Sequence, residues 1–310
     1  MKRIKFKTIH KTKMADTITP VGLYLRFRDT YANTLLLESS DYHSKEESFS
    51  FIAIDPVISV KAENDHLSFS HKGVELENQK IGRNFNAIFD RYSQTIDLDC
   101  SEELKPFNGF YGYTTYDAVQ YFENISLNVE QAPSAIPLMQ YSFYRFIIAI
   151  NHFNDEMTLI ENIEEGTASR IKEVQSIIDA QAFNTQKFEI VGEESSNVTG
   201  EEFKEYVRKA KSHCKRGDVF QLVLSRQFQQ KFKGDEFNVY RALRSINPSP
   251  YLFYFDYGSY KIFGSSPEAQ LVVENNKAEI HPIAGTFIRT GNDKKDSIEA
   301  KKLAINKKEN

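Results

Sequence analysis

The first half of the chain is built from short apolar runs separated by polar turns. Runs rich in Val, Ile, Phe and Tyr with a period of two are typical of β-strands. They predict strands over residues 21–27, 34–38, 49–54, 66–71, 143–150 and 157–161, the last two as a hairpin around Asn154-Asp155. Apolar residues recur at helical spacing over residues 84–92 and 167–183, which predicts two helices.

Residues 199–217 carry the signals of an amphipathic helix with defined ends. Thr199 and Glu202 have the spacing of a capping box, and Gly217 supplies the stop. The apolar residues that recur along this segment are Phe203, Val207, Ala210 and Cys214. They predict a buried face, in which Cys214 is a small apolar residue rather than a reactive thiol.

The remaining segments predict further strands and one more helix. We expect a strand over residues 218–228, a helix over 237–246, and strands over 251–257, 260–263 and 270–273. The polar stretch 184–197 predicts a boundary between an N-terminal region, residues 1–185, and a second region, residues 198–310. Antiparallel hairpins outnumber βαβ units, so the predicted fold class is α+β.

Composition narrows the class of protein. The 310 residues include 39 Lys and Arg against 43 Asp and Glu, a net charge of −4, with 40% hydrophobic and 26% charged residues. This balance excludes a disordered chain and gives no attraction for nucleic acid or anionic lipid. The two cysteines, Cys100 and Cys214, exclude a disulfide scaffold. Without a signal peptide or a membrane-spanning run, we expect a cytoplasmic protein with a small-molecule or protein partner.

General catalytic motifs give no assignment. The sequence contains no P-loop, GxGxxG, HExxH or GxSxG pattern. The seven histidines have no i, i+4 pair, so we do not expect a histidine metal site. The lysines after residue 293 are interleaved with Asp296 and Glu299, which indicates a solvated helix face rather than a nucleic-acid patch.

Several longer segments, taken in their order along the chain, indicate a protein family more specifically than these general motifs do. They are Leu35-Leu36-Leu37-Glu38-Ser39, Gly217 to Ser225, Asn247 to Phe253, Gly264-Ser265-Ser266-Pro267-Glu268, and His281-Pro282-Ile283-Ala284-Gly285-Thr286. Together they resemble the chorismate-utilising enzymes, most closely the anthranilate synthase component I family, along essentially the whole chain. The resemblance implies an α+β fold of two packed, mostly antiparallel sheets flanked by helices.

The resemblance assigns a chorismate site. Gly285 and Thr286 offer a backbone N–H and a hydroxyl to one carboxylate of chorismate, although Gly-Thr alone equally fits a strand-end turn. Glu268 matches the family's general acid, which protonates the leaving C4 hydroxyl and should lie in a partly dry pocket near other carboxylates. Without the family context, Glu268 is as well explained as a solvated turn residue.

Two positions separate this chain from sister enzymes. Relatives that add water to chorismate carry a general-base lysine where this chain has Gln221, and an amide cannot act as that base. Aminodeoxychorismate synthases carry a nucleophilic lysine where this chain has Ala284. Both residues favour anthranilate synthase chemistry, in which ammonia brings its own lone pair.

A second site implied by the resemblance is the family's feedback site for tryptophan. Glu38 matches the partner of the ligand ammonium and Ser39 a hydrogen-bonding residue. The later segment contributes Asn247, Pro250, Tyr251 and Leu252 as backbone contacts and an apolar wall, with Leu252 in place of a methionine. The alternative is a core strand and a Pro-rich turn without a ligand. Because the two segments are far apart in the chain, a shared ligand requires them to pack together.

The resemblance also implies a cofactor and a partner. The family uses Mg²⁺ and receives ammonia from a glutamine amidotransferase subunit, component II. Its members continue well beyond the position of Asn310, and we expect their metal ligands there rather than in this chain. We therefore expect the 310 residues alone to be inactive. The rival expectations are a non-catalytic fragment that binds only tryptophan or the partner subunit, and aminodeoxychorismate or salicylate synthase activity.

Overall fold

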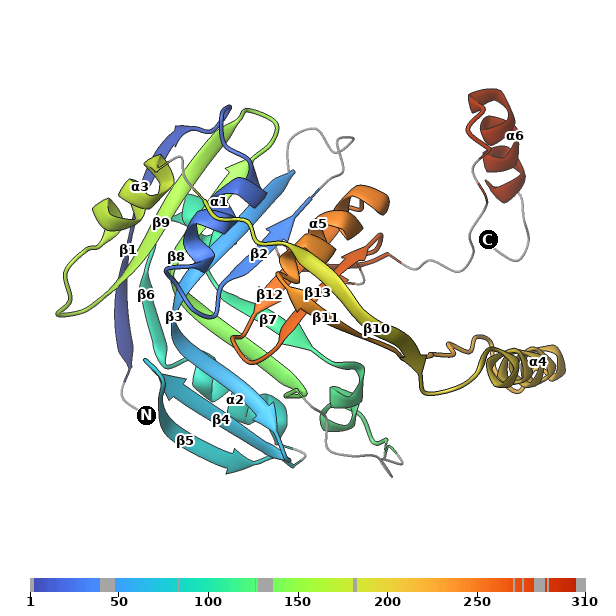
Figure 1. Cartoon of the computed structure of the whole chain (residues 1–310). Helices are drawn as coiled ribbons and strands as arrows, with labels where there is room; N and C mark the ends of the chain where they lie inside the picture. Colours follow the sequence, from blue (N-terminus) through green and yellow to red (C-terminus); the bar gives the residue numbers. More distant parts are fainter. Residues whose placement is uncertain are drawn as a thin grey trace.

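A computed structural model describes residues 3–39, 48–82, 84–125, 127, 136–180, 183–269, 271–274, 276–281, 288 and 290–304 (Figure 1). The strands are β1 (Ile4–Met14), β2 (Leu35–Glu38), β3 (Phe49–Glu63), β4 (His66–His71), β5 (Val74–Lys80), β6 (Ile96–Asp99), β7 (Phe110–Thr114), β8 (Met139–Asn151), β9 (Glu156–Glu164), β10 (Phe188–Ser196), β11 (Phe228–Gly234), β12 (Tyr251–Asp256), β13 (Lys261–Ser266), β14 (Leu271–Glu274) and β15 (Lys277–Ile280). The α-helices are α1 (Pro20–Arg28), α2 (Phe85–Ser93), α3 (Ile171–Asp179), α4 (Gly200–Arg216), α5 (Phe237–Ile246) and α6 (Asp293–Ala304), and the 3-10 helices are η1 (Glu102–Phe107) and η2 (Tyr116–Tyr121).

Within the described residues, eleven strands form one large sheet. Its central path runs β13-β12-β2-β3-β8-β9-β1-β6, while β4 and β5 extend from β3, and β7 pairs with β8. The pairs are antiparallel except for β1 with β6. Two small antiparallel sheets, β10–β11 and β14–β15, are separate from it. The α+β class predicted from the sequence is confirmed.

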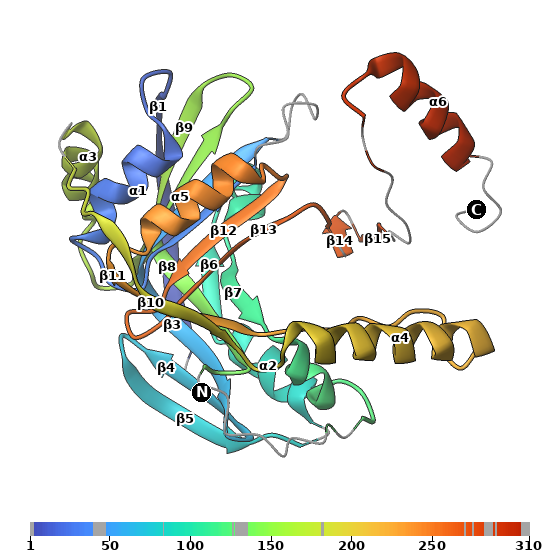
Figure 2. The same cartoon turned by 45° about the vertical axis from the view of Figure 1, so that its right-hand side comes forward.

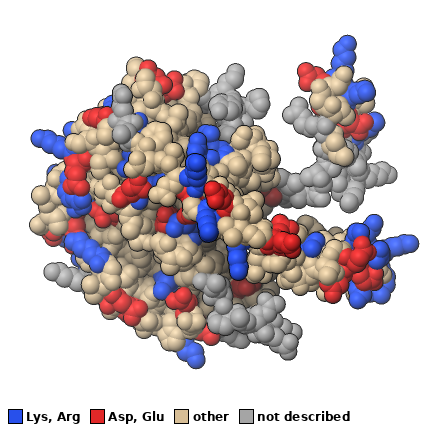
Figure 3. Space-filling view, in the orientation of Figure 1, with Lys and Arg blue, Asp and Glu red and all other residues tan. Residues whose placement is uncertain are grey.

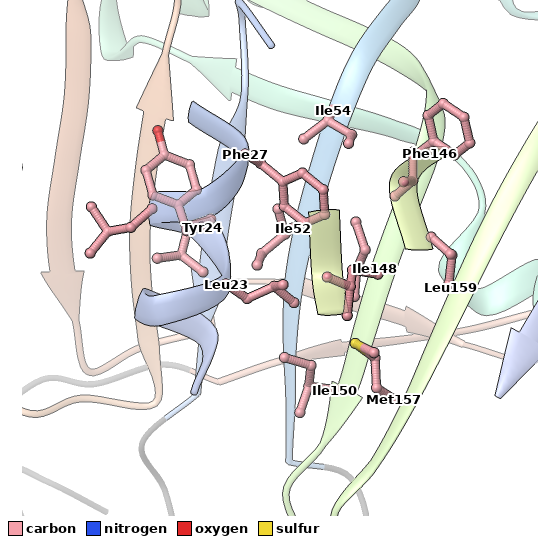
Figure 4. Packing of buried hydrophobic residues seen from close by; sticks show 14 of the residues in the cluster. Leu23, Tyr24, Phe27, Ile52, Ile54, Phe146, Ile148, Ile150, Met157 and Leu159 are labelled. Carbon is pink, nitrogen blue, oxygen red and sulfur yellow. The ribbon is translucent and has the colours of Figure 1, made fainter. Parts of the chain in front are cut away.

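Helices α1, α3 and α5 cover one face of this sheet (Figures 1 and 2). Figure 4 shows Leu23, Tyr24 and Phe27 of α1 facing residues of β3, β8 and β9. The same cluster includes Val174 of α3 and Phe237 of α5, all fully buried. Thr19 caps α1 by accepting a hydrogen bond from the Gly22 N–H at 3.1 Å, and Pro20 opens its first turn.

Strands β3 and β8 supply side chains to both faces of the sheet. Ile52 and Ile54 lie in the cluster under α1, whereas Ala53 lies in a second cluster on the opposite face with Tyr144 and Ile147. The far ends of β3 and β8 contribute to a third cluster, which packs under α2. These two long strands therefore join all three clusters.

Helix α4 forms as predicted but does not bury its apolar face. The capping box is present: Thr199 Oγ1 accepts from the Glu202 N–H, and the Glu202 carboxylate accepts from the Thr199 N–H at 2.8 Å. No residue of α4 is buried, and Cys214 is exposed. The prediction that Cys214 is buried is wrong, because α4 extends away from the large sheet and none of its residues packs into a buried cluster (Figures 1 and 2).

Two predicted strands are also wrong. Residues 21–27 belong to helix α1, since the Thr19 cap and the proline at its start favour a helix over the strand predicted from the apolar and aromatic residues. Residues 218–227 belong to no strand, because no neighbouring strand in the described part of the chain accepts their hydrogen bonds. Among their apolar side chains Phe220, Leu222, Val223 and Leu224 are exposed, Phe220 completely.

Most other predicted elements are confirmed, with changes in length. Helix α5 has the predicted bounds, and β8 and β9 form the predicted hairpin. The predicted helix over 167–183 is shorter, and β10 occupies most of the polar stretch 184–197. The basic start of the chain forms strand β1, which the sequence pattern did not predict. The proposed region boundary remains a prediction.

The surface carries mixed charge. Lys and Arg side chains alternate with Asp and Glu over the face shown in Figure 3, as the near-neutral composition predicts. Among the described residues, no helix has the length and apolar character needed to cross a bilayer.

Candidate functional site

The structure places the two segments of the predicted tryptophan site next to each other. Strand β2 pairs antiparallel with β12, and Glu38 lies opposite Leu252. On its other side β2 pairs with β3, which fixes it inside the sheet. The packing that a shared ligand requires is therefore present, although the roles of these residues in binding remain predictions.

Glu38 is a buried carboxylate with two partners on α5. Its side chain is 2% exposed. It accepts a hydrogen bond from Tyr240 Oη at 2.6 Å, and Arg244 Nε lies 3.1 Å from each of its oxygens. Burial raises the pKa of Glu38, and the hydrogen bond from Tyr240 and the charge of Arg244 oppose that rise. The carboxylate is thus already paired with a cation in this structure.

The other predicted ligand residues differ in accessibility. Ser39 and Pro250 are half-buried, and Asn247 is exposed at the end of α5, where its carbonyl accepts a hydrogen bond from Ser265 Oγ at 2.7 Å. Tyr251 is 46% exposed, whereas Leu252 is buried in the cluster under α1 and α5. Leu252 therefore packs mainly against protein here.

A pocket of about 510 Å³ adjoins this site between the start of α1 and α5. Its lining residues are Thr19, Val21, Asn238, Arg241, Ala242 and Arg244. Pockets of this volume are typical of small-ligand sites. Arg244 lines the pocket and also contacts Glu38, so it lies between the buried carboxylate and the open space.

His152 and Ser50 add further polar groups near Arg244. His152 Nε2 lies 2.7 Å from Ser50 Oγ, and Ser50 is buried on the strand next to β2. Burial lowers the pKa of His152, and the positive charge of Arg244 lowers it further. His152 is therefore expected to be neutral at physiological pH.

The structure does not gather the residues predicted to bind chorismate into one pocket among the described residues. Gln221 is exposed in the segment that forms no strand, and Glu268 is exposed after β13. The Glu268 backbone N–H donates to Ser266 Oγ at 3.4 Å. The partly dry pocket expected around Glu268 is not present among the described residues. Gly285, Thr286 and Ala284 lie outside the described residues.

Comparison with known proteins decides the family. A family model described as chorismate binding enzyme matches residues 35–310. The chain belongs to the chorismate-binding enzymes. The matched range includes every site residue predicted from the sequence.

Several curated chorismate-binding relatives carry one name. Anthranilate synthase component 1 of Acetivibrio thermocellus is 31% identical over 316 residues, and the match covers 95% of this chain and 63% of that protein. The protein of the same name from Geobacillus stearothermophilus is 30% identical, with 98% and 64% covered. The chain thus spans a little under two thirds of the length of these relatives.

Solved structures support the fold. Anthranilate synthase component I from Streptococcus pneumoniae matches with a TM-score of 0.67 at 24% identity, covering 96% of this chain and 64% of that one. The isochorismate synthase MenF from Escherichia coli matches with a TM-score of 0.53 at 11% identity, covering 87% and 52%. At these identities, the comparison establishes the chorismate-binding fold alone.

The described residues do not fit a magnesium site. They contain no group of three or more His, Cys, Asp or Glu side chains arranged to hold a metal ion. Mg²⁺ prefers a near-octahedral set of oxygen ligands. We therefore assign no metal ligand among the described residues and derive no catalytic step through a metal.

Sequence reasoning missed Tyr240, Arg244 and His152. Two signals were available for the first two. Glu38 ends an otherwise apolar strand, so its buried carboxylate requires a cation. Tyr240 and Arg244 are four residues apart on a correctly predicted helix and therefore share one face. Nothing in the sequence pattern pointed to His152.

Proposed function

We propose that this chain is the chorismate-binding component of an anthranilate synthase. The reaction joins chorismate and ammonia and yields anthranilate, pyruvate and water, with the C4 hydroxyl of chorismate leaving as the water. The observation that carries the proposal is the family match over residues 35–310, together with relatives named anthranilate synthase component 1. Gln221 and Ala284 support it because neither can act as the base or nucleophile of the sister reactions.

The proposed roles of the chain's residues follow from their chemistry. Glu268 donates a proton to the departing C4 hydroxyl, and Gly285 and Thr286 bind one carboxylate of chorismate. Ammonia forms the new C–N bond and needs no protein base, which is consistent with an amide at Gln221. We propose that a glutamine amidotransferase subunit supplies the ammonia and that the cytoplasm is the site of the reaction.

Two parts of this proposal depend on more than the 310 residues. Mg²⁺ is the proposed cofactor, and we propose that its ligands lie outside the described residues, among which no group of three or more His, Cys, Asp or Glu side chains is arranged to hold a metal ion. The chain spans a little under two thirds of its relatives. We therefore propose that the 310 residues alone do not turn over chorismate.

Feedback inhibition by tryptophan is the third part of the proposal. The adjacent positions of Glu38 and Leu252 support it, since β2 and β12 bring the two predicted segments side by side. Tryptophan that binds the folded state should raise the melting temperature of the chain. Ser39→Phe should abolish this rise by filling the site.

A second candidate function is binding without catalysis. The exposure of Gln221 and Glu268 favours it, because a general acid in water lacks the dry surroundings that tune its proton affinity. In that case the chain binds tryptophan or the amidotransferase subunit and performs no chemistry.

One assay separates the two candidates. The complete reading frame that contains these residues is expressed and given chorismate, ammonium and Mg²⁺, and anthranilate is followed by its fluorescence. We expect turnover, a loss of about 10²-fold or more in kcat for Glu268→Gln, and some isochorismate or salicylate from Gln221→Lys. Full activity of Glu268→Gln would exclude its role as the acid, and no activity in any form would favour the binding protein.

A further inference from the structure

Glu38 is a preformed binding site for one cation. The carboxylate is buried at the end of an apolar strand, opposite Leu252, and Tyr240 fixes its orientation through a 2.6 Å hydrogen bond. A buried carboxylate without a positive partner is strongly destabilising. While it is ionised, Glu38 therefore requires a cation at this position, and in this structure that cation is Arg244.

Arg244 is held more loosely than the other arginines that pair with buried carboxylates. Arg145, 15% exposed, contacts Glu161 through Nε and Nη2, and Arg28, 13% exposed, contacts Asp235 through both terminal nitrogens. Arg244 is 42% exposed, and its recorded bonds to Glu38 run through Nε alone. It also borders the pocket of about 510 Å³, which gives its guanidinium room to move.

We propose that Arg244 is a resident cation that the ammonium group of an amino-acid ligand displaces from Glu38. This inference deepens the proposed tryptophan site and rests on it. Arg244 shares its one Nε–H between the two carboxylate oxygens, whereas an ammonium group is a compact charge with three donors and can give each oxygen a hydrogen bond of its own. Tyr240 stays in place, and the released Arg244 side chain turns into the pocket between α1 and α5.

Such an exchange makes Arg244 an internal competitor of the ligand. Ligand binding must break the contact between Arg244 and Glu38. The free energy needed to break that contact weakens the binding of tryptophan. Removing the arginine removes the competitor and leaves Glu38 in need of a cation. In such a variant the ligand's ammonium group supplies the positive partner that Glu38 otherwise lacks.

The test compares Arg244→Met with Arg208→Met in the 310-residue chain by isothermal titration calorimetry. Arg208 is an exposed arginine that pairs with Glu205 on α4 and lines neither the pocket nor the Glu38 site, so it is the matched control. We expect Arg244→Met to melt at a lower temperature without ligand and to bind tryptophan about tenfold more tightly than wild type. Arg208→Met should leave the affinity unchanged. Indole-3-propionate, which lacks the ammonium group, should gain nothing from Arg244→Met.

A milder variant covers the case in which Arg244→Met does not fold. Arg244→Gln keeps a hydrogen-bond donor but loses the charge, and should show the same gain in affinity to a smaller degree. If wild type binds tryptophan and the Arg244 variants bind it equally well or more weakly, the exchange is overturned and the proposed tryptophan site stands. Absence of binding in wild type and in both variants overturns the exchange and the tryptophan site together.

Discussion

Helices α5 and α4 have similar sequence patterns but different surroundings. Both were predicted from apolar residues at helical spacing. Helix α5 buries Phe237 and Tyr240 against the large sheet, whereas α4 buries no residue. The same contrast separates β8, most of whose apolar residues are buried, from residues 218–227, most of whose apolar residues are exposed. A periodic pattern defines which face can be buried, and an opposing apolar surface decides whether it is.

The largest expected difference between the two regions concerns single aromatic side chains. Phe146 is fully buried in β8, and Phe220 is fully exposed. Phe146→Ala should lower the free energy of unfolding by about 3–5 kcal/mol through lost burial and a cavity. Phe220→Ala should change it by less than about 0.5 kcal/mol. Urea unfolding followed by far-UV circular dichroism measures both, and equal losses would contradict the comparison.

Ion pairs should show a similar contrast on a smaller scale. Arg145→Met leaves the fully buried carboxylate of Glu161 without its cation and should cost about 3 kcal/mol. Lys204→Met breaks an exposed pair with Glu201 on α4 and should cost about 0.5 kcal/mol or less. The same urea titration serves as the readout. A large loss in Lys204→Met would show that α4 is packed in solution.

The two capped helices offer a third comparison. Thr19→Ala removes the cap of α1, which is packed in the core, and should lower global stability by about 1 kcal/mol. Thr199→Ala removes the cap of α4 and should only increase local opening of that helix. Native-state hydrogen exchange distinguishes these effects, because α4 amides alone should exchange faster in Thr199→Ala.

The smallest expected effect concerns acid stability. Burial alone raises the pKa of Asp235, but hydrogen bonds from Arg28 and from the Phe237 N–H outweigh it and lower the pKa. A carboxyl group whose pKa is lower in the folded state stabilises the fold above its unfolded pKa of about 4, and this stability is lost as pH falls through the folded value.

Asp235→Asn should therefore be less stable at pH 7 but lose less stability between about pH 5 and pH 2. Asp218, just after α4, also has a lowered pKa, through Arg216 and then His213, but its side chain is exposed. Asp218→Asn should leave the acid limb of the unfolding curve unchanged. Thermal unfolding across this pH range tests both variants, and an equal effect of the two would be evidence against this assignment.

Secondary-structure elements were predictable from the sequence where several local signals agreed. Thr199, Glu202 and Gly217 marked both ends of α4, and the strongly apolar run 143–150 identified the core of β8. The sequence also indicated that Glu38 and the segment around Leu252 belong together, and their strands are paired. That inference came from a family resemblance, since pairing between residues so far apart leaves no local pattern.

The errors have physical reasons. Residues 21–27 were misassigned because β-rich composition was weighed above the Thr19-Pro20 start signal. Strand β1 was missed because it pairs at both edges through a basic, largely polar sequence. The partners of Glu38 were missed because they depend on how α5 crosses β2, and a sequence does not encode that crossing in any short-range spacing.

Strands β3 and β8 have a consequence for cooperativity. Their paired residues run from one end of the large sheet to the other, and they contribute to every buried cluster of the described chain. Separating these two strands would open all three clusters at once, so none of them can persist as an independent folding unit. The part of the molecule that holds Glu38 is therefore expected to be present as a whole or lost as a whole, in a single two-state transition.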